Sequence, residues 1–300
     1  MKMLPDKTNG KRKDGIIKAL SSNMIWGLLP LYISFVSDLS AWGVTGVRVI
    51  SCFAVLVCLV IYQRRLKEIK IIFKSGKEIK LLLISSSLLI INWLTYAYAV
   101  STGNVLEGSL GYFIYPLFVV GLGWLFFKER FNSLEKLAIG VAILAVGYAV
   151  MFYGKLPWIG LVLATSFSFY GVVRKKSSVE PILTLAIETL FIMPIAIGVV
   201  MWQFYFLNEA PELLLLAKAS FLGPITVLAM WLYISAVRVI PYSLSGMLFY
   251  ISPSLQIGVA LYLGEILSIN KLIAFILVWI SLAIYSFGNI KRSKPMPNLK

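Results

Sequence analysis

Three charged side chains lie inside long apolar runs of the sequence, where an ionisable group is costly. Arg48 and Glu188 lie about two helical turns inside two different runs, and Glu107 begins a third. An ionisable group within a membrane span costs roughly 2.5–3.5 kcal/mol on insertion scales, so it is usually paired or functional. These three residues are therefore the first candidates for a functional site.

Each of the three has more than one interpretation. Arg48 either forms a buried ion pair with Glu107 that holds helices together, or offers its guanidinium to a solute carboxylate or to a gate at the outer mouth. Glu188 has no obvious cationic partner at its own depth. It is therefore our first candidate for carrying a proton or binding an ammonium group, with Glu107 as the second. The alternative for Glu188 is a protonated carboxyl group bonded to a neighbouring helix.

Neutral side chains in the same runs suit an organic ligand. Aromatic rings provide apolar walls, and tyrosine and tryptophan add a hydrogen bond. The aromatic residues that flank the motifs described below rank highest as ligand contacts, and these are Trp93, Tyr112, Tyr170 and Tyr250. Asn92 and Gln256 offer neutral hydrogen bonds. For each ring, the competing interpretation is packing or contact with lipid.

The residue types needed for catalysis are missing. The chain has no histidine, and its two cysteines, Cys52 and Cys58, lie in one apolar run. A Ser-His pair and a histidine-based zinc site are thereby excluded. No phosphate-binding loop of the G-x-x-x-x-G-K-[ST] type occurs. We expect no enzyme activity, no metal and no cofactor.

Composition identifies the class of protein. Of the 300 residues, 59% are hydrophobic and only 14% are charged, against about 45–50% and about 25% in soluble domains. Mean hydropathy is +0.87. These values predict a multi-pass membrane protein whose main partner is the lipid bilayer. The formal net charge is +15. Most of the basic residues lie between apolar runs, which indicates that they set the membrane topology rather than bind nucleic acid.

Ten apolar runs are each long enough to cross a bilayer. They lie near 15–36, 42–62, 81–100, 106–127, 135–152, 156–173, 181–203, 213–237, 242–263 and 271–288. Basic residues gather in alternate loops and in both tails. The opposite loops carry few charges, namely Asp38, Lys155, Glu209, Glu212 and Glu265. The positive-inside rule then predicts ten transmembrane helices with cytoplasmic N and C termini, in the inner (cytoplasmic) membrane.

One basic loop has a helical pattern of its own. Lys67, Lys70, Lys74 and Lys77 recur at spacings typical of one helix face, with Leu66, Ile69 and Phe73 on another. This predicts a short amphipathic helix on the inner leaflet. It serves either as a topology anchor or as a docking site for a partner.

The two halves of the chain resemble each other. Phe113-Ile114-Tyr115-Pro116 in the fourth run corresponds to Tyr250-Ile251-Ser252-Pro253 in the ninth, and each run ends near a glutamate. The halves are 1–152 and 153–300, with five spans each. Because five is odd, the second half must be inverted relative to the first, as in many secondary transporters. Pro116 and Pro253 are the expected helix kinks, and we expect the site to lie near them.

Several of these motifs resemble a known family. The sequence is similar to the drug/metabolite transporter superfamily, EamA-type branch, and within it to the RarD-like permeases, also called chloramphenicol-sensitivity proteins. The resemblance covers roughly 15–290 and is carried by Ile25-Trp26-Gly27, Val47-Arg48-Val49, Asn92-Trp93-Leu94, Leu106-Glu107-Gly108-Ser109-Leu110-Gly111-Tyr112-Phe113-Ile114, Phe169-Tyr170-Gly171-Val172-Val173-Arg174-Lys175-Lys176 and Ile187-Glu188-Thr189. The sequence departs from the family at Val47, where histidine is usual, and at Tyr115, where asparagine is usual.

The resemblance implies an inner-membrane permease or exporter of small metabolites or drugs. The repeat adds alternating access around a fixed central site. Proton coupling, through Glu188 or Glu107, stays open, as do the substrate, the direction of transport and the oligomeric state. The alternative is a receptor or scaffold that does not transport, and a transport assay discriminates between the two.

Overall fold

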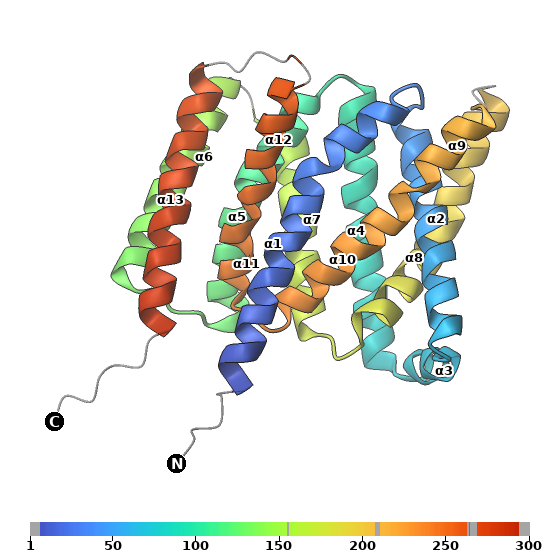
Figure 1. The fold of residues 1–300 in the computed structure, drawn as a ribbon, viewed down its shortest axis with the longest axis horizontal. Coiled ribbons are helices and arrows are strands. Elements are labelled where there is room, and N and C mark those ends of the chain that lie inside the picture. Colours follow the sequence, from blue (N-terminus) through green and yellow to red (C-terminus); the bar gives the residue numbers. More distant parts are fainter. Residues whose placement is uncertain (1–6, 155, 208–210, 263, 265–268, 294–300) are drawn as a thin grey trace.

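The computed structural model describes residues 7–154, 156–207, 211–262, 264 and 269–293, and within these ranges it contains helices and no strand. Most of the helices run roughly parallel or antiparallel across one layer-like bundle (Figure 1). A chain in lipid must satisfy its backbone hydrogen bonds internally, so its apolar runs become helices. The expectation of an all-α membrane protein is confirmed.

The helices follow the apolar runs closely. They are α1 (Lys7–Ile33), α2 (Ala41–Tyr62), α3 (Leu66–Lys74), α4 (Gly76–Ser101), α5 (Val105–Phe127), α6 (Ser133–Tyr153), α7 (Trp158–Lys176), α8 (Pro181–Met201), α9 (Leu213–Ser220), α10 (Leu222–Val237), α11 (Tyr242–Phe249), α12 (Ile251–Tyr262) and α13 (Ile269–Ser293). A 3₁₀ turn over Ser34–Val36 extends α1, and a π-helical turn over Trp202–Phe206 extends α8.

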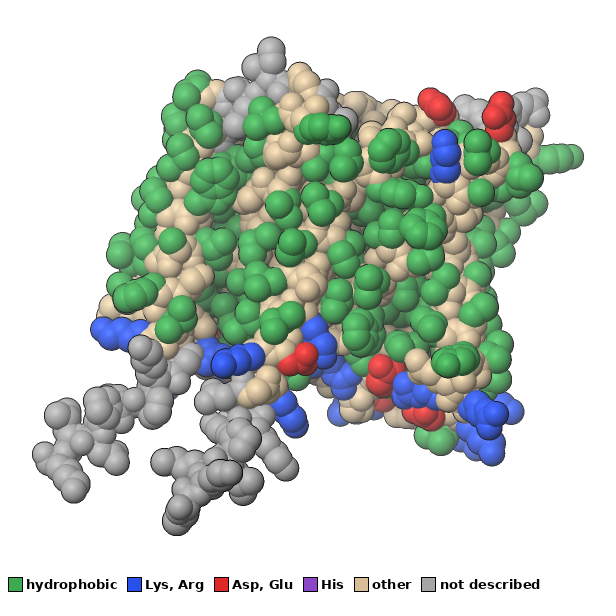
Figure 2. Space-filling model, viewed as in Figure 1, with side chains coloured by type: hydrophobic (Ala, Val, Ile, Leu, Met, Phe, Trp, Pro, Cys, Tyr) green, Lys and Arg blue, Asp and Glu red, His purple; other side chains and the backbone are tan. Residues whose placement is uncertain are grey.

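Nine helical segments in the described ranges are long and apolar enough to cross a membrane. The remaining expected run corresponds to α7, which ends in Arg174, Lys175 and Lys176 and buries many of its small and polar residues. α7 packs between α4 and α5, so it needs less apolar surface than a lipid-facing helix. Apolar side chains cover the flanks of the bundle (Figure 2), as expected for a surface in contact with lipid.

Two of the apolar runs are each split into two helices. α9 ends at Ser220 and α11 ends at Phe249, in each case four residues before a proline, Pro224 or Pro253. Proline has no N–H to donate to the carbonyl group four residues earlier, so the helix ends there and restarts. The assigned helix α5, by contrast, continues through Pro116.

Helices at matching positions of the predicted repeat are in contact. α2 packs against α8, α5 against α11, and α6 against α13. Several further contacts come in matched pairs: α1 with α10 and α7 with α4, α1 with α12 and α7 with α5, α2 with α10 and α8 with α4. The α6–α13 pair forms one edge of the bundle in Figure 1, and the α2–α8 pair lies toward the other.

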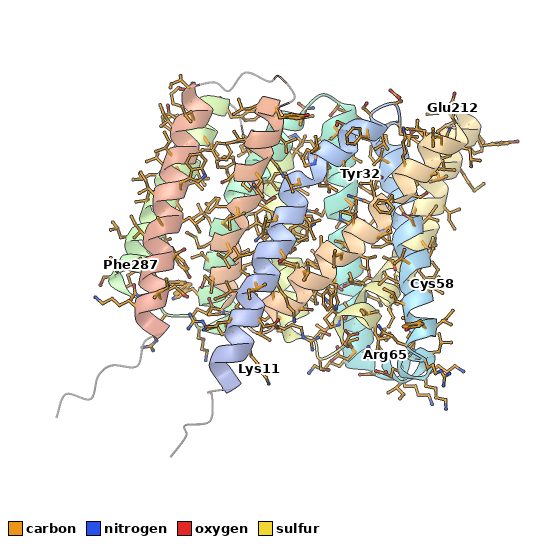
Figure 3. All side chains as sticks on the ribbon, viewed as in Figure 1. Lys11, Tyr32, Cys58, Arg65, Glu212 and Phe287 are labelled. Carbon is orange, nitrogen blue, oxygen red and sulfur yellow. The ribbon has the colours of Figure 1, made fainter. Side chains whose placement is uncertain are left out.

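Basic side chains gather at one end of the bundle. Figure 2 shows most of the visible Lys and Arg side chains along that end, where α1 begins and α13 ends. Lys11 and Arg65 lie at this end in Figure 3, and Glu212 lies at the opposite end. Lys155, Glu209 and Glu265 lie outside the described residues.

The basic loop contains the expected short helix, but α3 ends at Lys74. Lys77 belongs to α4, whose start is capped by the Ser75 hydroxyl, so the predicted face does not extend that far. Arg65 binds both carboxylate oxygens of Glu68 and reaches Glu180 at the start of α8 over 2.9 Å. The hydrogen bonds from Arg65 lower the pKa of Glu68. This ion cluster fastens α3 to the end of α8.

Candidate functional site

A cavity lies in the middle of the bundle, toward the end opposite the chain termini. Its volume is about 120 Å³. One buried water needs ~10–15 Å³, so the cavity is roughly ten times that size. It is therefore large enough for a small organic molecule. Four helices from each half of the chain supply the wall: α1, α2, α4 and α5, and α7, α10, α11 and α12. The lining residues are Trp26, Leu29, Pro30, Ile33, Arg48, Asn92, Trp93, Tyr96, Gly111, Tyr112, Tyr115, Leu163, Phe167, Thr226, Met230, Phe249, Ser252 and Gln256.

Five of the eight residues expected to bind a solute line this one cavity. They are Arg48, Asn92, Trp93, Tyr112 and Gln256. They come from four helices that are distant in the sequence, so only packing brings them together. The other three, Tyr170, Glu188 and Tyr250, are fully buried elsewhere in the bundle.

Arg48 is the charged residue of the cavity wall. Its guanidinium carbon lies 4.8 Å from the centre of the Trp93 ring, which is cation–π geometry. Its Nε atom is buried and has no hydrogen-bond partner. One turn later on the same helix, the Ser51 hydroxyl donates to the carbonyl oxygens of Val47 and Arg48.

The expected ion pair between Arg48 and Glu107 is absent from the described residues. Glu107 instead accepts hydrogen bonds from the Tyr153 hydroxyl at 2.5 Å and from the Ile159 backbone N–H at 2.7 Å. Ile159 lies in the first turn of α7, where a carboxylate satisfies a free N–H group and faces the positive end of the helix dipole. Glu107 therefore caps α7.

The two amide side chains of the cavity wall, Asn92 and Gln256, differ in how tightly they are hydrogen-bonded. Asn92 donates to the Leu163 carbonyl oxygen at 3.0 Å and to the Ser166 hydroxyl at 3.1 Å, which ties α4 to α7. Gln256 makes longer contacts of 3.4 Å with the Trp26 carbonyl oxygen and the Ser252 hydroxyl. Asn92 is thus fixed by packing, and Gln256 is the less constrained of the two.

Aromatic side chains form one side of the cavity and continue beneath it. Phe249 lies 4.5 Å from Tyr115 and 5.9 Å from Trp26, measured between ring centres. Phe167 stacks on Tyr170 at 5.6 Å, so Tyr170 lies behind the wall. Phe167 and Tyr170 also stack on Tyr233, at 5.1 and 6.4 Å between ring centres, and this aromatic layer continues beyond the cavity wall.

Glu188 has a cationic partner, contrary to the sequence-based expectation. Its Oε1 atom lies 3.4 Å from Nε of Arg174 on α7, and both side chains are fully buried. It also accepts hydrogen bonds from the Ser85 hydroxyl and, at 3.1 Å, from the Tyr170 hydroxyl. The expected apolar run ends at residue 173, which predicts that Arg174 lies in a cytoplasmic loop. Residue counting missed the pair because α7 extends further toward the basic end than its apolar run.

The expected kink positions differ in their surroundings. Pro253 follows the break at Tyr250, whose hydroxyl donates to the Phe113 carbonyl oxygen at 3.2 Å. The backbone of Pro116 lies against Gly246 of α11, where an added Cβ would come within 3.2 Å of the Pro116 oxygen. α5 and α11 thus meet at Pro116 and Gly246, and Ser252, next to Pro253 on α12, lines the cavity.

Sequence reasoning gave too little weight to several cavity residues. Phe167, Met230 and Thr226 lie in apolar runs without any local motif, so nothing in their spacing points to a ligand. Ser252 adjoins a proline of the repeat, and that position was a usable signal. In the described ranges, no cluster of three His, Cys, Asp or Glu side chains could hold a metal ion.

Comparison with known proteins gives a consistent result. Residues 13–151 match the EamA-like transporter family. The chain is 34% identical to an uncharacterized transporter of Pseudomonas aeruginosa, over 94% of this chain and 96% of the relative. It is 33% identical to the uncharacterized transporter YojE of Bacillus subtilis, over 94% and 97%. It is also 33% identical to the Escherichia coli protein RarD, over 91% and 94%.

A solved structure shares the fold. The crystal structure of another protein superposes with a TM-score of 0.73, covering 92% of this chain and 98% of the other. The two sequences are 16% identical, so this similarity concerns the fold alone.

Proposed function

This chain belongs to the EamA-like transporter family, among its RarD-like permeases, and from that premise we propose that it is a secondary transporter that moves small organic metabolites or drugs by alternating access through the central cavity. Membrane transport in general follows from the family. The cargo and the mechanism are proposals that rest on the geometry described above.

The observation that carries the mechanism is the shared cavity. Residues 1–152 and 153–300 each contribute four helices to its wall. We propose that these halves are two inverted repeats of five spans, with α7 as the tenth span. The matched pairs of helix contacts support a pseudo-twofold axis that passes between the halves. Rocking of one repeat against the other would then expose one site to either side.

The charge distribution supports an orientation. We propose that the basic end faces the cytoplasm, with both termini there, in the inner membrane. The cavity lies toward the other end, and aromatic rings fill the path to the cytoplasm. The structure then corresponds to a state closed on the cytoplasmic side.

Glu188 is the carboxyl group that a proton-coupled mechanism would use. Glu107 is engaged as the cap of α7. Glu188 and Arg174 lie between the aromatic layer and the basic end, on α8 and α7. Ser85 on α4 of the other half binds the same carboxylate, so opening of that end would disturb this cluster. Protonation of Glu188 would weaken this ion pair and so favour opening.

Two substitutions on one helix test transport through the cavity. Gln256 lines the cavity, whereas Gly258 on the same helix is exposed and has nothing within 4 Å of an added Cβ. Gln256→Trp should fill the cavity and lower transport at least tenfold, because a solute can no longer occupy its site. Gly258→Trp should transport at the wild-type rate. The measurement is counterflow in proteoliposomes with labelled amino acids, organic acids, amines and amphenicol-type drugs.

Equal transport by the two variants would show that solutes do not pass through this cavity. If folded wild-type protein shows no counterflow of any solute in the panel, the receptor or scaffold alternative is favoured for those solutes.

A further inference from the structure

The cavity carries a positive charge and no negative one. Arg48 is the charged side chain among its lining residues, and none of the lining residues is Asp or Glu. The titratable groups that interact with its charge are the thiol of Cys52 and the phenols of Tyr96 and Tyr112. Thiols and phenols are ordinarily neutral near pH 7. Within the described part of the chain, the cavity therefore has a net charge close to +1.

The guanidinium of Arg48 has unused hydrogen-bonding capacity. Its Nε atom is buried without a partner, and no described residue accepts a hydrogen bond from its terminal nitrogens. Arginine stays protonated at physiological pH, and an unpaired charge within a membrane span is costly. The Trp93 face offsets part of this cost. An anionic ligand would supply both the counter-charge and the missing acceptors.

A carboxylate matches both the single positive charge and the shape of this group. The guanidinium fork donates two parallel hydrogen bonds to the two oxygens of a carboxylate. Aromatic and thioether side chains surround the rest of the space, among them Trp26, Tyr112, Met230 and Phe249. A planar apolar body fits these walls by stacking and edge contacts.

An ammonium group finds no equivalent partner. With no carboxylate in the wall, the ammonium of an amino acid or amine would lose water without gaining a counter-charge. The Asn92 amide donates to Leu163 and Ser166 of α7, so toward a ligand it offers only its neutral carbonyl oxygen and no counter-charge. The site therefore discriminates by charge as well as by shape.

Resting on the proposed function, we propose that the cargo class is an organic monocarboxylate with an aromatic-sized apolar body. Its carboxylate binds Arg48 and its ring lies among the cavity aromatics. The site prefers this anion to the zwitterion, the neutral amide and the amine of the same skeleton.

Four compounds with one skeleton test the preference: 3-phenylpropionate, 3-phenylpropionamide, phenylalanine and 3-phenylpropylamine. Binding is measured by calorimetry on the full chain in nanodiscs at pH 7. We expect 3-phenylpropionate to bind about 10- to 100-fold more tightly than the amide, the range of one charge-assisted hydrogen-bond pair. Phenylalanine should bind more weakly than 3-phenylpropionate, and the amine weakest.

Variants of Arg48 separate binding from a structural role. Arg48→Gln should abolish the preference for the acid over the amide, and Arg48→Lys should keep part of it. The control is Lys218→Gln, which removes an exposed charge outside the cavity and should bind like wild type. Without ligand, Arg48→Gln should melt no lower than wild type, since no carboxylate loses its partner. A strong loss of stability would instead indicate a structural charge and would overturn the proposal.

The remaining outcomes are also decisive. Equal affinity for acid and amide, tighter binding of phenylalanine or the amine, or no binding of 3-phenylpropionate overturns the anion site. Counterflow of neutral solutes would then leave the transporter proposal standing. If 3-phenylpropionate binds in an Arg48-dependent way but is not transported into proteoliposomes, the anion site is supported and the transporter proposal is overturned for this solute.

Discussion

At the scale of single residues, the charged side chains of the spans have three different roles. Glu107 caps a helix, Arg48 faces the cavity, and Glu188 pairs with Arg174 behind the aromatic layer. Their positions in apolar runs made all three candidates for a functional site but left several roles open for each. What distinguishes them is the partner that each side chain meets, and that is a property of the helix packing.

The Arg174–Glu188 pair gives a prediction about stability. Both side chains are fully buried, so removal of one partner leaves an uncompensated charge. Arg174→Gln or Glu188→Gln should each destabilise the protein by about 3–5 kcal/mol. The double variant should lose less than the sum of the two, because it leaves no orphan charge. Thermal melting of the four proteins in one detergent measures this, and additive losses would show that the two residues do not interact.

The same double variant tests proton coupling. A single Glu188→Gln protein confounds coupling with instability, whereas the Arg174→Gln/Glu188→Gln protein does not. If Glu188 carries the coupling proton, an imposed pH gradient should accelerate wild-type uptake and leave the double variant unaffected. Acceleration in both proteins would assign coupling elsewhere, and acceleration in neither would describe an uncoupled permease.

At the scale of helices, close backbone contact between α5 and α7 holds the two halves together at the cavity. A Cβ on Gly160 would lie 2.9 Å from the Glu107 carbonyl oxygen, and one on Gly111 would lie 3.0 Å from that of Gly160. Glycine at such positions lets membrane helices approach closely. Gly111 also lines the cavity, so the spacing of these helices sets the cavity's shape.

Gly160→Ala should therefore lower stability by about 1–3 kcal/mol, the typical cost of overpacking, and reduce transport by moving α7. Gly140→Ala is the control, since Gly140 is an exposed residue inside helix α6 with nothing within 4 Å of its added Cβ. Its stability should equal or exceed that of wild type, because alanine favours a helix over glycine. Equal melting temperatures for the two variants would argue against a tight α5–α7 contact.

At the scale of the whole molecule, the proposed topology places the two ends of the bundle on opposite sides of the membrane. In a Cys52→Ala/Cys58→Ala background, Glu212→Cys should react with an impermeant maleimide in intact cells. Lys70→Cys on α3 should react only after the inner membrane is permeabilised. Both parent residues are exposed, so access rather than burial sets the result. Reaction of Lys70→Cys in intact cells would show that the proposed orientation or the proposed number of spans is wrong.

Much of this architecture is readable from the sequence. Lipid imposes helices on apolar runs, so nine spanning segments and their order follow from hydropathy, and the helix that α3 forms follows from its spacing. Arg48 stood out because a charge in an apolar run is costly wherever it lies. The ordered motifs predicted membership of the family, and the comparisons confirmed that membership.

The contacts that distinguish the site come from tertiary structure. Whether Tyr112 reaches the cavity while Tyr170 lies behind Phe167 depends on how each helix is rotated about its axis, and hydropathy alone does not set that rotation when all neighbours are apolar. The partner of Glu188 came from a helix whose end the apolar run placed too early. The cavity itself forms between eight helices, so its charge and shape exist only once both halves pack together.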